Sequence, residues 1–326
     1  MTEKATSNES KILIMNNRDV DNWLELMTIC FKDSLERERL DIDEIRSTMK
    51  KINKVSYKII MRLFRFKILN YLIKNGEKIV SASTLNINKK NGTISNVMTH
   101  PDYRRRGLAK KLVQHTLEKA KDFGLEKVSL EVKADNVGAI KLYEKEGFVR
   151  NYHSITFELE NPSESLSTNI NPLSIRKIDQ INKELFDNLL DNCYQKRYFE
   201  TRSREKMAKD YIPSRIMRFI MSKFANQQIF LFGLFNKKTN GPRGYIRAFT
   251  SRLEKGISIS SPIVDKEDEI HLKSLLADII KNIDPAKKYL KISFSKHRKN
   301  LMDDFLASGF TIIDESLAMH KILNKS

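Results

Sequence analysis

An arginine-rich loop joins a predicted strand to a predicted helix in the first half of the chain, which has 326 residues. The strand pattern ends near Thr99, and Arg104, Arg105 and Arg106 come directly before Gly107, where the helical pattern begins. The first amides of a helix have no internal acceptors, and together with the helix dipole they attract an anion. We therefore expect a phosphate site in this loop; the alternative is a solvated basic loop that caps a helix.

Two side chains further along the chain could move protons. Glu131 lies in a predicted strand, and because strand residues alternate between two faces, it is directed away from the apolar residues of that strand. Those apolar residues are Val128, Leu130 and Val132. Tyr143 lies in the next predicted helix, and a phenol with a pKa of about 10 is protonated at neutral pH and can act as an acid. The alternatives are a surface carboxylate balanced by Lys133 and a tyrosine of the hydrophobic core.

The elements that must position these residues follow an α/β order. Apolar periodicity predicts strands at Lys11–Met15, Ile68–Ile73, Ile79–Asn88, Thr93–Met98, Lys127–Val132 and Ser154–Leu159, and helices at Asp21–Lys32, Ile42–Ile59, Gly107–Phe123 and Gly138–Glu146. Asn75-Gly76 and Asn91-Gly92 are typical of tight turns, so we expect a hairpin meander between the first and the last helices. This order predicts an α/β (α+β) fold with a mixed central sheet.

The two halves of the chain carry a faint repeat. Cys30 and Cys193 each end an apolar helical run, and Gly147 and Gly309 are each followed by phenylalanine. The separation of the two cysteines along the chain is nearly equal to that of the two glycines, which favours one architecture used twice. The polar segment 161–171 is predicted to be a linker, so we expect domains at residues 11–160 and 172–326 and a poorly ordered stretch at residues 1–10.

The composition is that of a soluble globular protein. The chain has 59 Lys and Arg against 41 Asp and Glu, a formal net charge of +18, and 40% apolar residues. No run of about 18 apolar residues and no secretory signal pattern is found, so we expect a cytoplasmic protein. Two cysteines are too few for a disulfide scaffold or a thiolate metal site. The positive charge is spread over both halves; it suits acidic partners, phosphates or nucleic acid, or reflects a basic proteome background.

Two segments carry a resemblance to the GNAT acetyltransferase superfamily. The run Arg104-Arg105-Arg106-Gly107-Leu108-Ala109 fits its Q/R-x-x-G-x-G/A signature, and Leu130 to Phe148 (LEVKADNVGAIKLYEKEGF) resembles the second half of its cofactor site. The second segment is most similar to ribosomal-protein alanine N-acetyltransferases, and the resemblance spans about residues 12–160. The loop has neither the G-K-[ST] element of a Walker loop nor the three glycines of a dinucleotide fingerprint.

The resemblance implies acetyl-CoA as co-substrate and no metal. It implies that the amides of residues 105–109 hold the diphosphate, and that the pantetheine pairs with the strand end Val97–Thr99, where a splay from the next strand leaves backbone groups open. It also implies Glu131 as general base, Tyr143 as general acid, and Asn136 as a residue that contacts the CoA arm and caps a helix. The implied cofactor-binding residues are Val97, Met98, Thr99, Arg104, Arg105, Arg106, Gly107, Leu108, Ala109, Asn136 and Tyr143.

The acceptor can be argued from the free energy needed to remove its proton. Deprotonating a lysine side chain at pH 7 costs about 4.6 kcal/mol, whereas a peptide α-amine costs only about 1–1.4 kcal/mol. One carboxylate acting through water suits the second task. We therefore expect direct transfer to a primary amine, namely the N-terminal α-amine of a peptide or protein. A small-molecule amine stays open as the acceptor, and so does a non-catalytic acetyl-CoA-binding sensor or adaptor.

A basic segment borders the expected acceptor site. Between Arg46 and Lys67 the chain has eight basic residues and no acidic one. An acidic acceptor or a ribosome-bound chain would suit this segment, and a solvated helix face is the alternative. The positive charge is the only feature that favours association with nucleic acid or the ribosome. No membrane association is expected.

The second half is expected to be a degenerate GNAT-like domain. When Gly147 is aligned with Gly309, Tyr143 corresponds to Phe305 and Glu131 to Ser293, so the acid and the base are both missing. The place of the diphosphate loop falls on the segment 265–269, which has four carboxylates and would repel a diphosphate. We expect this domain to lack an acetyl-CoA site and to shape the acceptor cleft or bind a partner.

Overall fold

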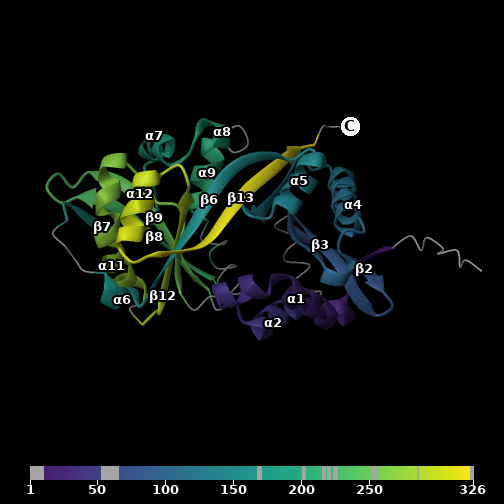
Figure 1. Ribbon diagram of the computed structural model, residues 1–326. Helices are drawn as coiled ribbons and strands as arrows, with labels where there is room; N and C mark the ends of the chain where they lie inside the picture. The colour runs from purple at the N-terminus through teal and green to yellow at the C-terminus, as the bar shows by residue number, and fades with distance from the viewer. Residues whose placement is uncertain are drawn as a thin grey trace, which may run out of the picture. The chain divides into compact units, whose positions relative to one another are not determined.

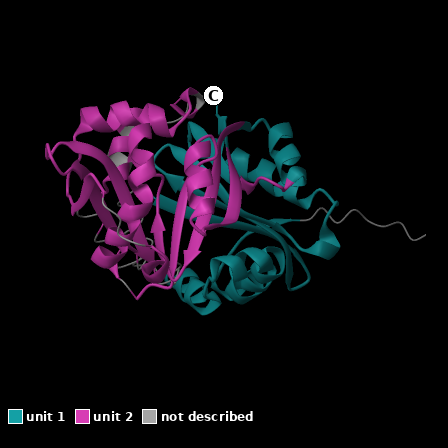
Figure 2. Cartoon of the chain, turned by 60° about the vertical axis from the view of Figure 1, so that its left-hand side comes forward, with its two compact units in different colours: residues 1–131, 137–149, 319–326 teal, residues 132–136, 150–318 magenta. Residues whose placement is uncertain are grey.

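The computed structural model describes residues 11–52, 66–166, 171–199, 203–214, 227–251, 256–284 and 286–323, together with Arg218 and Ser222. Residues 1–10, residues 53–65 of the basic segment and residues 167–170 of the expected linker lie outside the described residues. The chain divides into two compact units (Figure 2). Unit 1 contains residues 1–131, 137–149 and 319–326, and unit 2 contains residues 132–136 and 150–318.

Unit 1 is built on a mixed sheet in the order β1-β2-β3-β4-β5 (Figure 1). Its strands are β1 (Ile12–Ile14), β2 (Phe66–Asn75), β3 (Lys78–Asn88), β4 (Asn91–Thr99) and β5 (Lys127–Lys133), whose last two residues are counted in unit 2. β2, β3 and β4 form an antiparallel meander, and β5 pairs with β4 in parallel. The expected mixed sheet with a central meander is thus confirmed.

The end of β13 (Thr311–Ile322) also belongs to unit 1, from Met319 onward. The amide of Leu323 donates to the carbonyl of Glu126 at 2.9 Å. Lys321 Nζ donates to the carbonyl of Glu146 at 2.5 Å. The last described residues of the chain are therefore held by the same unit as the arginine-rich loop.

Helices cover both faces of the sheet of unit 1 because neighbouring strand residues point to opposite sides. Ala82 of β3 is buried in the cluster that α1 covers, whereas the next residue, Ser83, has its Oγ 3.0 Å from Thr116 Oγ1 of α4. These helices and their neighbours are α1 (Val20–Glu38), α2 (Ile42–Ile52), α4 (Leu108–Asp122) and α5 (Val137–Lys145). The arginine-rich loop thus leads from the central strand β4 into a helix that packs on the sheet.

One expected turn is wrong. The chain reverses at Lys89-Lys90, where Lys89 has φ 55°, and Asn91 and Gly92 are the first residues of β4. Gly92 is required by close packing instead, since a Cβ there would lie 2.9 Å from Leu125 Cδ1. The other expected turn, Asn75-Gly76, is confirmed between β2 and β3.

The strands of unit 2 follow the order β13-β6-β12-β10-β9-β8-β7 and are again mixed in direction, with β11 paired to β9. Its further strands are β6 (Val149–Glu160), β7 (Leu173–Lys177), β8 (Gln227–Asn236), β9 (Pro242–Ser251), β10 (Ile257–Ile259), β11 (Ile263–Val264) and β12 (Tyr289–Ser295). Its described helices are α6 (Pro162–Ser165), α7 (Lys183–Cys193), α8 (Lys196–Phe199), α9 (Arg204–Tyr211), α11 (Leu272–Ile283) and α12 (Lys299–Ala307). Tyr245 is buried in the cluster of α7 and Ile246 in that of α11, so both faces of this sheet are covered too.

The expected repeat is confirmed by the lengths of the elements. β5 and β12 have 7 residues each, and α5 and α12 have 9 residues each. The members of each pair are separated along the chain by the same number of residues as Gly147 and Gly309. A hydrogen bond is repeated as well. Cys30 Sγ donates to the Thr99 carbonyl at 3.4 Å and Cys193 Sγ to the Pro262 carbonyl at 3.3 Å, each across 69 residues. The two halves are therefore two copies of one architecture.

Candidate active site

β4 and β5 lie side by side and then separate. Their register joins Asn91–Ile94 to Lys127–Leu130, and beyond these pairs the register of β4 continues with β3. A bulge accompanies the change, because the β3–β4 register shifts here and Asn96 has φ 50°. The stretch Val97–Thr99 is thus a strand edge on the side where β5 would have continued the sheet. Such an edge can pair with an extended ligand that carries amides.

The carbonyl of Thr99 marks the end of this edge and accepts two hydrogen bonds. One comes from Cys30 Sγ at 3.4 Å and the other from Arg104 Nε at 3.2 Å. Burial raises the pKa of the Cys30 thiol, and the neighbouring Arg104 guanidinium opposes that shift only in part. Cys30 is therefore a protonated donor rather than a thiolate, and it anchors the strand end to α1.

The loop between β4 and α4 turns sharply toward the helix. It begins with a 3-10 turn at Pro101–Tyr103, and Arg105 and Gly107 then adopt left-handed conformations, with φ 63° and 78°. Arg106 folds back on the loop, since its Nη2 donates to the Asp102 carbonyl at 2.8 Å and its guanidinium lies 5.0 Å from the Tyr103 ring centroid. A Cβ built on Gly107 would meet no atom within 4 Å. The space in front of the loop is open.

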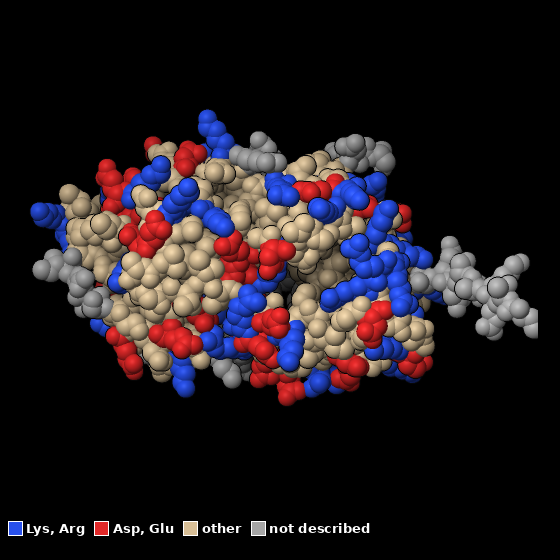
Figure 3. All heavy atoms as spheres, in the orientation of Figure 1, with Lys and Arg blue, Asp and Glu red and all other residues tan. Residues whose placement is uncertain are grey.

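The amides of this loop are available to a ligand. The first amide of this stretch that donates to another protein group is that of Lys111, to the Gly107 carbonyl at 2.9 Å. Within the described ranges, none of the amides of residues 105–110 donates to a protein acceptor. These open donors and the N-terminal end of the 15-residue α4 converge on one place and favour an anion there. Figure 3 shows Lys and Arg side chains gathered over the part of unit 1 where Figure 1 draws α4 and β2.

Glu131 is exposed on β5, just beyond the last residue that pairs with β4. The predicted alternation of this strand is confirmed, because Val128, Leu130 and Val132 are buried. Lys133, which the sequence offered as a balancing charge, forms an ion pair with Asp314. The carboxylate is thus carried by the strand that diverges from the β4 edge, where it can take up a proton.

Tyr143 lies in α5 with its ring buried, only 5% exposed, and in contact with the Phe148 ring at 5.9 Å between centroids. Burial raises the pKa of its phenol to about 12. Among the described residues, none forms a hydrogen bond with the hydroxyl. The ring of Tyr143 is therefore buried, and its hydroxyl stays protonated at neutral pH.

The remaining predicted residues fall into two groups. Met98 and Leu108 are buried, and Val97, Thr99 and Ala109 are half-buried, so these residues fix the backbone on both sides of the loop. The side chains of Arg105 and Asn136 are exposed. Asn136 directly precedes α5, and its amide donates to the Lys133 carbonyl at 3.0 Å.

A metal site and a membrane span are not found in the part of the chain that the structure describes. No three His, Cys, Asp or Glu side chains of the described ranges are grouped to hold a metal ion. No helix among the described residues is long and apolar enough to cross a membrane.

In unit 2 the residues that correspond to the candidate acid and base cannot act as an acid or a base at neutral pH. Phe305 takes the place of Tyr143 in α12 and is 1% exposed within a cluster of aromatic rings. Ser293 takes the place of Glu131 in β12, and its Oγ lies 2.8 Å from Thr156 Oγ1. Neither side chain can take the proton of an amine as a carboxylate does.

Sequence reasoning missed the contacts of the Thr99 carbonyl. Cys30 and Cys193 served only as markers of the repeat, yet their thiols donate to the equivalent carbonyls of Thr99 and Pro262. The signal was present, because the two cysteines hold equivalent places in the repeat and would be expected to meet equivalent neighbours. The contact of Arg104 with Thr99 left no such signal in the sequence.

Comparisons with known proteins agree with this geometry. The model of the acetyltransferase (GNAT) family matches residues 29–148. The [ribosomal protein bS18]-alanine N-acetyltransferase of Escherichia coli K12 is 32% identical over 93 residues, which are 27% of this chain and 63% of that protein. The enzyme of the same name from Salmonella typhimurium is 31% identical over 80 residues, 24% of this chain and 54% of that protein. The chain thus spans less than two thirds of the length of these relatives.

Solved structures match both units together. A tandem GNAT protein from the clavulanic acid biosynthesis pathway has a TM-score of 0.62 at 14% identity, covering 97% of this chain and 99% of its own. A GCN5-related N-acetyltransferase from Sphaerobacter thermophilus has a TM-score of 0.60 at 12% identity, covering 96% and 95%. At such identities the likeness concerns the fold. Residues 29–148 therefore match the acetyltransferase (GNAT) family, in a chain that has the fold of a tandem GNAT protein.

Proposed function

We propose that unit 1 is an acetyl-CoA-dependent N-acetyltransferase that acts by direct attack of a primary amine on the thioester. The observation that carries this proposal is the strand edge Val97–Thr99 beside the open amides of residues 105–109. An edge that can pair with the pantetheine and a cluster of donors for the diphosphate are the two halves of a CoA site. The side chains of Arg104 and Arg105 add positive charge to the second half.

Two residues are proposed to move the protons. Glu131, exposed on the diverging strand, would take the proton of the attacking amine, directly or through a water molecule. Tyr143 would protonate the leaving thiolate. Its pKa of about 12 keeps the proton available at neutral pH. Burial would also raise the pKa of a CoA thiol beside it, since burial disfavours the charged form, and this rise would offset the weaker acidity of the phenol.

The acceptor is proposed to be the N-terminal α-amine of a peptide or protein. Its deprotonation at pH 7 costs about 1–1.4 kcal/mol, against about 4.6 kcal/mol for a lysine side chain. A single carboxylate suits the easier task. The relatives are named as alanine N-acetyltransferases of a ribosomal protein, and these names support the same class of acceptor.

The test is release of the CoA thiol from acetyl-CoA with a matched set of acceptors. A peptide with a free N-terminal alanine is compared with the same peptide blocked at the α-amine but carrying a lysine, and with simple alkylamines. We expect turnover with the free α-amine to exceed that with the blocked peptide by at least about 10-fold, given the difference in deprotonation. Turnover with alkylamines alone would move the acceptor to the small-molecule class. CoA binding without turnover on any acceptor would replace the enzyme by a sensor.

A further inference from the structure

The strands of unit 2 separate in the same way as those of unit 1. β10 pairs in parallel with β12 from Ile257 to Ile259, after which β11 pairs with β9 instead. Between β10 and β11 lies Pro262, which corresponds to Thr99 because each accepts the hydrogen bond of the repeated cysteine. The gap that would receive an extended ligand therefore exists in the backbone of unit 2.

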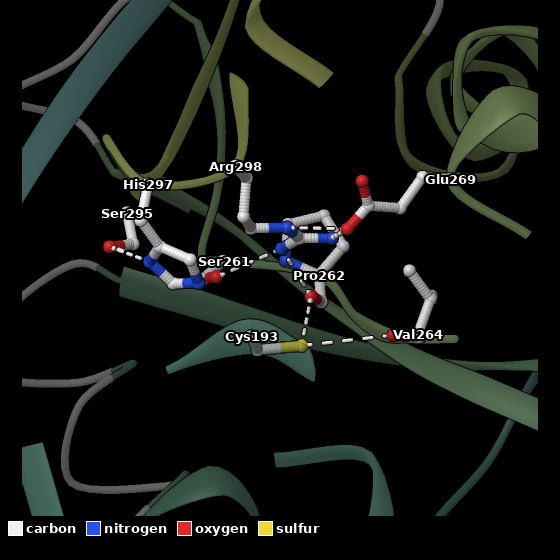
Figure 4. A network of polar contacts seen from close by, with 8 residues as sticks. All are labelled: Cys193, Ser261, Pro262, Val264, Glu269, Ser295, His297 and Arg298. Atoms are coloured by element: carbon white, nitrogen blue, oxygen red, sulfur yellow. Dashed lines mark hydrogen bonds and ion pairs between the residues drawn. The ribbon is translucent and has the colours of Figure 1, made fainter. Parts of the chain in front are cut away.

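The side chain of Arg298 fills this gap (Figure 4). Arg298 directly precedes α12, as Asn136 precedes α5, and its side chain is only 2% exposed. Its Nη1 donates to the Pro262 carbonyl at 2.9 Å, and its Nε donates to Glu269 Oε1 at 2.7 Å. The guanidinium thus binds the carbonyl that corresponds to Thr99. In unit 1 that carbonyl accepts from Arg104, but Arg104 is exposed, whereas Arg298 is buried and held by a carboxylate.

The place of the diphosphate in unit 2 is also closed by protein groups. The acidic segment forms a 3-10 helix, Lys266–His271, that leads directly into α11. Asp268 is paired with Arg243, whose Nε lies 2.8 Å from Asp268 Oδ2, and Glu269 is paired with Arg298. Where unit 1 presents open amides and arginines, unit 2 presents carboxylates that already have cationic partners.

We propose that the Arg298–Glu269 pair is a built-in substitute for a bound cofactor, so that unit 2 is complete without a ligand and the chain binds acetyl-CoA in unit 1 alone. The guanidinium supplies N–H donors to a strand-end carbonyl, and Glu269 supplies the anion that holds it. The correspondence between this gap and a cofactor site rests on the proposed function of unit 1. The claim that the ion pair completes unit 2 is independent of that function.

The first test is the thermal midpoint of the full chain with Arg298→Ala. The change leaves the Glu269 carboxylate, 11% exposed, and the Pro262 carbonyl without their donor, and we expect Tm to fall on the order of 10 °C. Arg204→Ala is the control, because this arginine of unit 2 is 35% exposed and pairs with Asp191, a carboxylate that is 60% exposed. We expect its Tm to fall by no more than about 3 °C. Equal effects of the two changes would overturn the proposal.

The second test adds a small guanidinium compound to the Arg298→Ala variant, to replace the missing side chain. Arg298→Ala removes the atoms of an ethylguanidinium ion, so ethylguanidinium chloride should raise the Tm of this variant in a saturable way and leave that of the unaltered chain unchanged. Ethylammonium, which lacks the planar group of donors, serves as the control cation and should not raise it. No rise with ethylguanidinium, or an equal rise with both cations, would contradict a guanidinium-shaped site.

The third test is the number of CoA molecules bound by the unaltered chain, measured by titration calorimetry, which needs no variant to fold. One molecule per chain is expected. Two molecules would overturn the proposal for unit 2. Zero molecules would refute the proposed function of unit 1, and the ethylguanidinium experiment would still decide whether Arg298 completes unit 2. The two proposals can therefore fail separately.

Discussion

Replacing Gly107 by alanine tests whether the loop before α4 holds the diphosphate. Gly107 has φ 78°, and an added Cβ would meet no atom within 4 Å, so the change introduces strain without a clash. A left-handed backbone costs a residue with a Cβ about 1–2 kcal/mol, and the loop relieves this strain by turning its amides. Because acetyl-CoA binding has to restore the loop, we expect Kd to rise about 5- to 30-fold in titration calorimetry.

Gly124→Ala is the matched control for this change. Gly124 has φ 64°, an added Cβ would again meet no atom within 4 Å, and the residue follows the C-terminal end of α4 rather than its beginning. Gly124→Ala should lower the stability by about 1–2 kcal/mol and leave Kd unchanged, whereas in Gly107→Ala the cost should appear in Kd. An unaltered Kd in Gly107→Ala, or the same rise in both variants, would refute the reasoning.

Three further changes test the chemistry and the packing of unit 1. Tyr143→Phe should lower turnover about 100-fold and leave the Kd for acetyl-CoA unchanged; unaltered turnover would remove Tyr143 from the mechanism. Because burial raises the pKa of Tyr143 to about 12, the rate should show no loss from ionisation of this group between pH 7 and 10, and a decline near pH 10 that disappears in Tyr143→Phe would contradict the buried acid. Glu131→Gln should slow turnover about 100-fold at pH 7 and recover above about pH 8, where the α-amine loses its proton unaided, as a pH–rate profile would reveal. Gly92→Ala should lower the free energy of unfolding by about 1–3 kcal/mol, measured by denaturant titration, because its Cβ would lie 2.9 Å from Leu125 Cδ1; wild-type stability would mean that β4 and β5 adjust freely.

The order of elements could be predicted where apolar residues alternate or repeat without interruption. β5 is such a case, because Val128, Leu130 and Val132 are buried as the pattern requires. β6 is not, since it runs from Val149 to Glu160 although the expected strand begins at Ser154. Its first residues are mostly polar and not fully buried, so their pairing with other strands left no periodic signal.

Two other features depend on partners that are distant in sequence. The positive φ of the turn before β4 falls on Lys89 rather than on a glycine. Gly92 instead lies against Leu125 and Val128, which are more than 30 residues away in the sequence. The loop of the candidate site could be picked out from the sequence, because its glycine, arginines and helix start are contiguous. The filling of the equivalent gap by Arg298 was not, because only the folded chain brings this side chain to Pro262.

The exchange of the last strand has a consequence for synthesis. Unit 1 contains residues up to Val149 and then nothing until Met319. At about 5–20 residues per second, ribosomes need roughly 10–30 s to make the intervening stretch. During that time the half-built sheet exposes the backbone of β5 to any passing strand, which is a route to misassembly. Unit 1 can therefore complete its set of residues only after the end of β13 has been synthesised.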